Sequence, residues 1–315
     1  MEKVSVIIPT YKRPKKLVRA IESVLHQTYN NIEVIVVDDN DEGSQYRKTT
    51  ESLMNKYKDH KNVIYVKHKK NLNGAAARNT GINKSCAKYI AFLDDDDEFL
   101  PKKIEEQIKC LKLKDESYKA CYCNYYQYIN GDLIQKISKK DEGNLIEDLL
   151  LGKNTIAAGS SLLIEKQVLR KLGGFDERFD RHQDWEFLVR YFRDYKLALA
   201  PKFLLKLHRG SILNKPNSKK YYDIKNFFLD EFKEDINSLP RSKEILQFHW
   251  KETSKVFFLD SKYKMGFRLL KKANHYKKIS LYEYFRLFSV ILAKKLGLLN
   301  YLKRVKNKVV FYIKK

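Results

Sequence analysis

Short apolar runs alternate with amphipathic segments in the first third of the chain. The apolar runs, rich in Val and Ile, are VSVIIP at 4–9, IEVIVVD at 32–38, NVIYV at 62–66 and YIAFLD at 89–94. Helical spacing of apolar residues follows them at 14–27, 44–58, 74–85 and 101–114. Continuous β-branched runs separated by helices are typical of buried parallel strands joined by right-handed crossovers. The pattern predicts an α/β domain with a Rossmann-like, mostly parallel sheet, flanked by helices, that binds ligands at the carboxyl ends of its strands.

The pattern changes twice after residue 114. Residues 119–211 mix strands over 119–129 and 160–166 with helices near 144–151 and 183–194, and such a run would extend the sheet. The polar stretch NKPNSKK at 214–220 indicates a linker, and only helical patterns follow it. We therefore expect two domains, a sheet domain over 1–212 and a helical, strongly basic region over 213–315.

Positive charge is concentrated near the C-terminal end. Of the formal net charge of +24, residues 261–315 contribute +15, from sixteen Lys or Arg and one acid, Glu283. Leu, Phe, Tyr, Ile and Val alternate with these cations at near-helical spacing, as in helices that lie on anionic membranes. We expect this segment to contact such a membrane. Packing on the rest of the chain, or on a second subunit in a homodimer, is the alternative.

Three further features bear on location. The four cysteines, Cys86, Cys110, Cys121 and Cys123, lack the paired C-x-x-C spacing of zinc sites. The N-terminal residues show no basic-then-apolar signal layout, and no window holds the roughly 20 apolar residues that cross a bilayer. We expect reduced cysteines in a cytoplasmic protein that is peripheral on the inner face of the cell membrane.

Carboxylates cluster where the fourth predicted strand ends. The run DDDDE occupies 94–98, directly after YIAFL. In extended backbone alternate side chains share a side, so Asp94 and Asp96 can face one cation while Asp95 and Asp97 point elsewhere. Mg²⁺ and Mn²⁺ prefer such hard oxygen ligands, together with water and phosphate oxygens. From this segment alone, a solvated acidic loop is the alternative.

Two more polar segments follow predicted strands. Asp38 and Asp39 end the second strand, where they could accept hydrogen bonds from a base or ribose or could form a turn. The segment NLNGAAARNTGI at 71–82 puts Gly and Ala at the start of a helix, with Arg78 in its first turns. This arrangement is typical of an anion site, and equally of a helix packed closely on a sheet.

Taken together, these segments resemble glycosyltransferase family 2, inverting enzymes of the GT-A fold. The likeness rests on VSVIIPTYKRP, IEVIVVDDND, NGAAARNTGI, YIAFLDDDDEFLP and GGFDERFDRHQDWEFLVR, in this order across residues 3–212. The resemblance implies transfer of a sugar from a nucleotide diphosphate, a UDP-sugar in particular, to a hydroxyl of a glycan or lipid-linked glycan. The expected product is a capsule, an O-antigen or another bacterial surface polysaccharide.

The same resemblance implies the site residues. Eight of them would bind the nucleotide sugar: Pro9, Thr10, Tyr11, Arg13, Asp39, Arg78, Asp94 and Asp95. A Mn²⁺ or Mg²⁺ ion would be held by Asp94 and Asp96, and Asp95 could replace Asp94 because four aspartates are consecutive. His208 matches a histidine that can approach the metal or the diphosphate, although a lone histidine has a structural explanation as well.

Asp184, in HQDWEFLVR, matches the catalytic base of the family. A carboxylate within hydrogen-bond reach can take the proton of a sugar hydroxyl as that hydroxyl attacks the anomeric carbon. Gln183 stands where many relatives have Glu, so one negative charge beside the base is missing. The structural alternative for Asp184 is an acid in the first turn of a helix.

Three other kinds of protein compete with this interpretation. A nucleic-acid-binding protein could use the basic tail but would leave the acidic clusters unexplained, so we expect no nucleic acid partner. A nucleotidyltransferase shares the sheet and metal chemistry, but usually has a Gly-rich phosphate loop after its first strand, and IIPTYKRP contains no glycine. An inactive relative is disfavoured by the presence of both Asp96 and Asp184.

Overall fold

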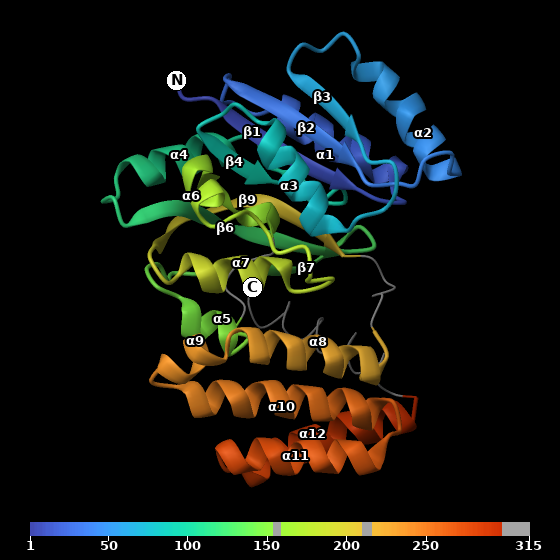
Figure 1. The fold of residues 1–315 in the computed structure, drawn as a ribbon, viewed down its shortest axis with the longest axis vertical. Coiled ribbons are helices and arrows are strands. Elements are labelled where there is room, and N and C mark those ends of the chain that lie inside the picture. Colours follow the sequence, from blue (N-terminus) through green and yellow to red (C-terminus); the bar gives the residue numbers. More distant parts are fainter. Residues whose placement is uncertain (154–158, 210–215, 298–315) are drawn as a thin grey trace. The chain divides into compact units, whose positions relative to one another are not determined.

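The computed structural model describes residues 1–153, 159–209 and 216–297 (Figure 1). The chain divides into two compact units. The sheet unit comprises Met1–Ile146 and Thr155–Ser211, and the helical unit comprises Glu147–Asn154 and Ile212–Lys315. The main division lies beside the boundary expected at 212. Glu147–Asn154, which we expected in the first domain, groups with the helices.

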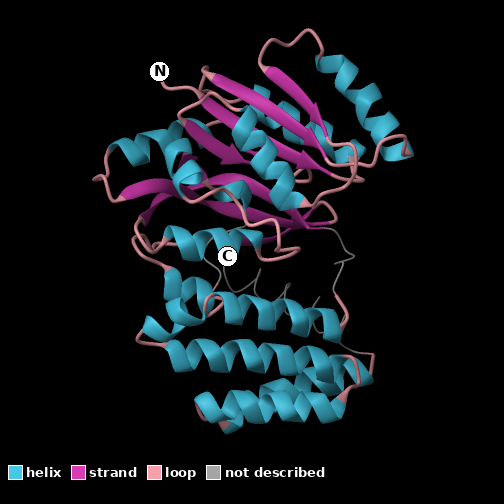
Figure 2. Ribbon diagram, in the orientation of Figure 1, coloured by secondary structure: helices cyan, strands magenta, loops and turns pink. Residues whose placement is uncertain are grey.

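Nine strands of the described residues form one sheet in the sheet unit (Figure 2). Its order is β3-β2-β1-β4-β8-β6-β9-β5, and β7 pairs with β6. The strands are β1 (Val4–Thr10), β2 (Ile32–Asp38), β3 (Val63–Lys67), β4 (Tyr89–Phe92), β5 (Glu98–Phe99), β6 (Tyr118–Ile129), β7 (Asp132–Ile137), β8 (Leu163–Glu165) and β9 (Lys196–Arg209). The first four strands are mutually parallel, as predicted, and β6 and β9 are also parallel.

Helices follow the strands as the sequence pattern predicts, except over Lys166–Lys171, where it predicted no helix. They are α1 (Pro14–Leu25), α2 (Gln45–Met54), α3 (Gly74–Lys84), α4 (Lys103–Lys112), α6 (Lys166–Lys171) and α7 (Gln183–Tyr191), with short 3₁₀ turns η1 (Asn55–Tyr57) and η2 (Gly159–Ser161). The predicted strand over 160–166 is divided between η2 and β8. The sequence pattern did not predict the short strands β5 and β7, which lie at the edges of the sheet.

Both faces of the central strands are covered, which explains their continuous apolar runs. Val6 and Ile8 of β1 belong to the same buried cluster as Leu17 of α1. Ile7 points to the opposite face, where α3 approaches so closely that a Cβ at Gly81 would lie 2.4 Å from the Ile7 side chain. A larger residue than glycine at position 81 would therefore separate α3 from the sheet.

Strand register brings the ends of these strands to one edge. Thr10, the last residue of β1, pairs with Asp38, the last residue of β2. On the other side of β1, Ile7 pairs with Phe92, the last residue of β4. The loops that begin after residues 10, 38 and 92 therefore leave the sheet side by side, which is where parallel sheets bind ligands.

The helical unit is built around one long helix, α10 (Ser242–Leu259). The other helices are α5 (Ile146–Leu150), α8 (Ser218–Glu231), α9 (Lys233–Ser238), α11 (Tyr263–Tyr276) and α12 (Leu281–Lys295). α10 packs against α8, α11 and α12, and a Cβ at Gly266 of α11 would lie 2.9 Å from the ring of Phe258. The helical prediction is confirmed for residues 218–295, and the end of the predicted basic tail, 298–315, lies outside the described residues. Among the helices described, none combines the length and the apolar character that crossing a bilayer requires.

Candidate active site

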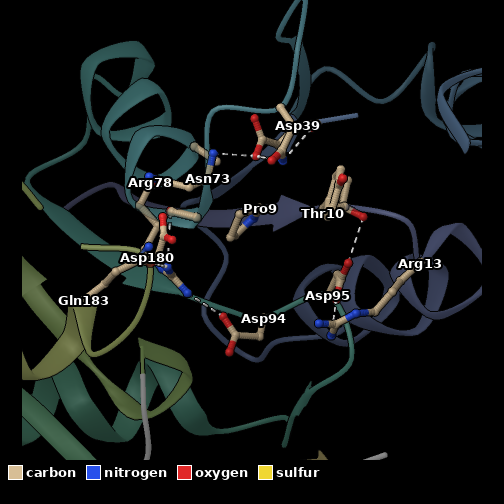
Figure 3. Close-up of a pocket in the computed structure, with 14 residues that line it drawn as sticks. Pro9, Thr10, Arg13, Asp39, Asn73, Arg78, Asp94, Asp95, Asp180 and Gln183 are labelled. Carbon is tan, nitrogen blue, oxygen red and sulfur yellow. Dashed lines mark hydrogen bonds and ion pairs between the residues drawn. The ribbon is translucent and has the colours of Figure 1, made fainter. Parts of the chain in front are cut away.

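A cavity of about 350 Å³ opens at the edge where β1, β2 and β4 end (Figure 3). It brings together all eight residues expected to bind a nucleotide sugar. Its lining consists of Pro9, Thr10, Tyr11, Arg13, Asp39, Asn71, Asn73, Gly74, Ala77, Arg78, Asp94, Asp95, Asp180 and Gln183. The eight expected residues come from three separate strand ends and one helix, so the fold alone makes them neighbours.

Asp39 anchors one wall of this cavity. Its carboxylate accepts hydrogen bonds from the His68 ring (2.7 Å), the Asn71 amide (2.6 Å) and the backbone N–H groups of Leu72 (2.9 Å) and Asn73 (3.0 Å). Two carboxylate oxygens have room for about four such bonds. A nucleoside base would therefore have to displace one of these donors to bind Asp39, and the carboxylate already fixes the loop that precedes α3.

Arg78 spans the space between the acidic turn and α7. Its guanidinium donates to Asp94 Oδ1 (2.7 Å), to Gln183 Oε1 (3.0 Å) and to the carbonyl of Gly74 (3.2 Å). The guanidinium also lies over the ring of Phe175, 5.6 Å from its centroid. Figure 3 shows the side chain directed along the wall of the cavity. These contacts hold one positive charge in place before any anion arrives.

The four consecutive aspartates form a turn and not an extended strand end. The Asp97 N–H donates to the carbonyl of Asp94 at 2.9 Å. Our expectation that alternate residues share a side is therefore wrong, because side chains alternate only in extended backbone. In the structure the adjacent residues Asp94 and Asp95 line the cavity. Asp96 is not among the described lining residues.

Asp95 is the most deeply buried carboxylate of this turn that faces the cavity. It accepts hydrogen bonds from the Thr10 hydroxyl (2.9 Å) and from Arg13 (3.1 Å). Burial raises its pKa to about 7, although the positive charge of Arg13 opposes the shift. The carboxyl group therefore gains or loses its proton close to neutral pH.

Asp96 and Asp97 have different surroundings. Asp96 forms ion pairs with Arg13 (2.7 Å) and Lys16 (3.4 Å). Asp97 is buried, where it accepts hydrogen bonds from the Ser160 hydroxyl (2.6 Å) and the His208 N–H (2.9 Å). Burial raises the pKa of Asp97 well above its usual range. This residue connects the turn to β9 and η2 and is structural.

A smaller cavity of about 190 Å³ adjoins the first and contains Asp184. The two cavities share Arg78, Asp94, Asp180 and Gln183. Asp184 lies in the first turn of α7, which follows His182 in left-handed backbone with φ of 62°. Burial raises the pKa of Asp184, and the nearby positive charge of Arg78 opposes this shift. A carboxylate with a raised pKa accepts a proton more readily, as a general base requires.

His208 lies on β9 and does not line either cavity among the described residues. Its ring stacks on Tyr128 with 5.1 Å between centroids, and its Nε2 atom is 3.6 Å from Glu98 Oε2. Burial lowers the pKa of His208 and so favours the neutral ring. Its role toward a metal stays a prediction.

The sequence analysis missed several residues of the cavity wall. Asn73 caps α3 by accepting hydrogen bonds from the N–H groups of Ala75 and Ala76, and its backbone has φ of 104°. An Asn directly before a predicted helix start is an N-cap signal that could have identified it. Asn71 and Asp180 lie in loops, where no periodicity gives a signal.

The donor set allows only a limited role for the protein in metal binding. Asp94 and Asp96 offer hard carboxylate oxygens, and the side chain of Asp94 is 33% exposed. Yet the described residues contain no group of three His, Cys, Asp or Glu side chains arranged to hold a cation. The residues therefore fit a Mg²⁺ or Mn²⁺ ion that takes most of its ligands from water and from the phosphates of a bound ligand.

Comparison with known proteins identifies relatives of this chain. Residues 5–173 match the family model described as glycosyl transferase family 2. An uncharacterized glycosyltransferase of Methanocaldococcus jannaschii, MJ1057, is 31% identical over 227 residues, which cover 70% of this chain and 76% of the relative. The amylovoran biosynthesis glycosyltransferase AmsB of Erwinia amylovora is 26% identical over 314 residues, covering 97% of this chain and 96% of AmsB.

Solved structures of S. aureus TarS share the fold. One TarS chain superposes with a TM-score of 0.61 at 15% identity, covering 87% of this chain and 53% of TarS. TarS 1-349 in complex with UDP-GlcNAc gives a TM-score of 0.57 at 14% identity, covering 87% and 90% of the two chains. At such identities the likeness concerns the fold, and it confirms the predicted fold class.

Proposed function

This chain belongs to glycosyltransferase family 2, and from that premise we propose that it is an inverting enzyme that transfers a sugar from a UDP-sugar to a glycan hydroxyl. The observation that carries the proposal is the cavity at the sheet edge, which gathers all eight expected donor residues. The structure of TarS 1-349 with UDP-GlcNAc supports UDP as the nucleotide, because that complex has the same fold.

We propose that the larger cavity binds the nucleotide diphosphate. Arg13 and Arg78 line it and supply positive charge for the phosphates. Arg78 is already held by Asp94 and Gln183, so it needs little rearrangement. When bound, a Mg²⁺ or Mn²⁺ ion held by Asp94 at the cavity would neutralise charge that develops on the leaving diphosphate. Asp96 would join it only by leaving its partners Arg13 and Lys16.

The smaller cavity then holds the acceptor hydroxyl, with Asp184 as the general base. The carboxylate takes the hydroxyl proton as the oxygen attacks the anomeric carbon from the side opposite the leaving group. The sugar is transferred with inversion, and the proton stays on Asp184 until solvent removes it. Arg78 and Gln183 border both cavities and so fix the distance between donor and base.

The relatives support a proposal for the acceptor class. The name of AmsB refers to biosynthesis of the polysaccharide amylovoran, and AmsB aligns with nearly the whole of this chain. We therefore propose that the acceptor, free or lipid-linked, belongs to a bacterial surface polysaccharide assembled on the cytoplasmic face of the membrane. The family match favours this reaction over a nucleotidyltransferase.

Donor binding is testable by thermal protection. UDP-, GDP-, CMP- and dTDP-sugars are each added with Mn²⁺ or with EDTA, because a ligand that binds only the folded state raises the melting temperature. We expect protection by a UDP-sugar that depends on Mn²⁺. Equal protection in EDTA would remove the metal from the proposal, and protection by another nucleotide alone would replace UDP.

The base is testable by Asp184→Asn. We expect the variant to keep donor protection while transfer falls by about 10²–10⁴-fold, because only proton removal is lost. Asp194→Asn, an exposed residue paired with Lys171, is the matched control and should transfer normally. If the Asp184 variant instead lost donor protection, Asp184 would belong to the donor site and another group would be the base.

A further inference from the structure

Helix α12 has an apolar face that the described part of the chain leaves exposed. Leu287 and Ile291 are buried where α12 packs on the rest of the unit, and α10 is one of its contacts. A second set, Leu281, Phe285, Phe288 and Leu292, repeats at helical spacing and stays exposed, with Leu281 at 88% and Phe285 at 74%. A helix that is apolar on two sides needs a second apolar environment.

This second face borders an apolar groove of about 590 Å³. Phe258 of α10 forms its floor, Tyr263 and Phe267 of α11 form one wall, and Phe285 and Phe288 of α12 form the other. The ring of Phe267 meets that of Phe258 edge to face at 4.9 Å. We call these side chains, together with Leu281 and Leu292, the aromatic face.

Cations outnumber acids on the helices that carry the aromatic face. Residues 261–297 contain ten Lys or Arg and one acid, Glu283. Glu283 is already paired with Lys251. Lys264, Arg268 and Arg286 are among the cations exposed on α11 and α12. Lys295 lines the groove itself, so an approaching surface meets apolar side chains on helices that carry an excess of positive charge.

We propose that the aromatic face inserts into the headgroup region of an anionic lipid bilayer. Amphipathic helices with Phe and Leu on one side and Lys and Arg on the other bind such surfaces through apolar burial and charge attraction together. The inference deepens the membrane location proposed above and rests on the helical unit alone. It does not depend on which donor the sheet unit binds.

Charge argues against the other occupants. A second copy would bring the same excess of cations to the interface. Residues 298–315 add six Lys or Arg and no acid, so their charge does not complement that of the helical unit. A nucleic acid strand would match the charge, but phosphates need cations along the groove, and its lining is mostly aromatic and aliphatic.

Vesicle binding by the full chain tests the proposal. The protein is sedimented with vesicles of phosphatidylcholine alone and of phosphatidylcholine mixed with phosphatidylglycerol, at low and high salt. We expect binding to the anionic vesicles that weakens with salt. Phe285→Ser combined with Leu292→Ser should reduce the partition coefficient at least about tenfold. Lys264→Glu combined with Arg286→Glu should reduce the partition coefficient at least as much, because each cation near the surface contributes about fivefold to binding.

Matched controls lie on the sheet unit. Leu113 is 86% exposed and Lys48 is exposed on α2, so Leu113→Ser and Lys48→Glu should leave vesicle binding unchanged. In every variant, a donor should raise the melting temperature as much as it does in the parent chain. If no donor protects the parent, every variant should keep the melting temperature of the parent. This readout separates failure of the membrane proposal from failure of the donor assignment.

Four outcomes would overturn the proposal. The first is equal binding to neutral and anionic vesicles, and the second is wild-type binding by the Phe285→Ser, Leu292→Ser variant. The third is that a single-stranded oligonucleotide displaces the parent protein from the vesicles and that this variant no longer binds the oligonucleotide. The fourth is a dimer in light scattering that the same variant dissociates, since the aromatic face would then be an interface between copies.

Discussion

Two pairs of adjacent aspartates follow β2 and β4, the strands on either side of β1, at the same sheet edge but serve different purposes. Asp38 is fully buried, where it pairs with Arg47 at 3.0 Å. Asp94, in contrast, is one-third exposed and pairs with Arg78 across the wall of the cavity. Both segments are runs of acids after a buried strand, and the sequence pattern alone does not distinguish them.

The difference lies in the partners that the fold supplies. The first pair is surrounded by short donors: the Tyr65 hydroxyl and the Asn40 amide bind Asp38, and loop N–H groups bind Asp39. These partners, with the buried Arg47, use the available lone pairs, so the pair holds the loops at one wall of the site in place. The second pair is neutralised chiefly by arginine side chains that line the cavity, where their charge also faces a phosphate. Acids whose charged partners line the cavity are the ones left for ligand chemistry.

The largest effect should come from breaking the first pair. Asp38→Ala leaves the buried Arg47 without its counter-charge, so we expect the free energy of unfolding to fall by about 3–5 kcal/mol. Denaturant unfolding measures this change. Asp59→Ala, at an exposed acid, should change stability by less than about 0.5 kcal/mol. A mild effect of Asp38→Ala would mean that both pairs are equally dispensable to the fold.

Asp95→Asn should stabilise the chain, and only at high pH. Because the folded pKa is raised from 3.8 to about 7, the folded state holds a proton that the unfolded state releases between these values. The contribution of this carboxyl group to the free energy of unfolding is therefore fully favourable below about pH 4, and it is lost as pH rises through 7. Asn mimics the protonated form, so we expect a gain of about 2–4 kcal/mol at pH 8 that shrinks toward pH 4. A gain independent of pH would contradict this account.

Asp94→Asn should affect turnover and not folding. The variant keeps its shape but loses the charge that orients Arg78, and we expect turnover with Mn²⁺ to fall about 100-fold, or about 2.7 kcal/mol. The unfolding midpoint should stay within experimental scatter, since a partly exposed ion pair contributes little to stability. Normal turnover would place the catalytic charge elsewhere in the turn.

The smallest effect is expected at the rim. Lys16 is 43% exposed and lies 3.4 Å from Asp96, so Lys16→Gln should reduce stability by less than about 0.5 kcal/mol. Raising the salt concentration should abolish even this difference. A larger or salt-independent loss would show that Asp96 is as rigidly held as Asp38.

Regular patterns made the first half of the fold predictable. Strands β1 to β4 and helices α1 to α4 were predicted because each strand is a buried Val- and Ile-rich run and each helix has one apolar face. Those strands end at one edge, so the convergence of Thr10, Asp39 and Asp94 followed from topology alone. Loop residues such as Asp180 carry no such periodicity.

The features of the fold and the site that the sequence did not predict depend on contacts between residues far apart in the sequence. Nothing local to Asp38 shows that Tyr65 will donate a hydrogen bond to it from β3. Likewise, the alternation expected at Asp94 and Asp96 failed because the chain turns there to reach β5. The roles of Asp184, Asp96 and His208 stay predictions, since geometry places these residues without showing what they bind.

The fixed position of Arg78 has a consequence in entropic terms. A free arginine side chain loses on the order of 2 kcal/mol of rotamer entropy when it is immobilised. Here the loss occurs during folding, when Asp94, Gln183 and the ring of Phe175 confine the guanidinium. Binding of an anionic ligand therefore costs little further rotamer entropy at Arg78, and a larger share of the electrostatic attraction contributes to the affinity.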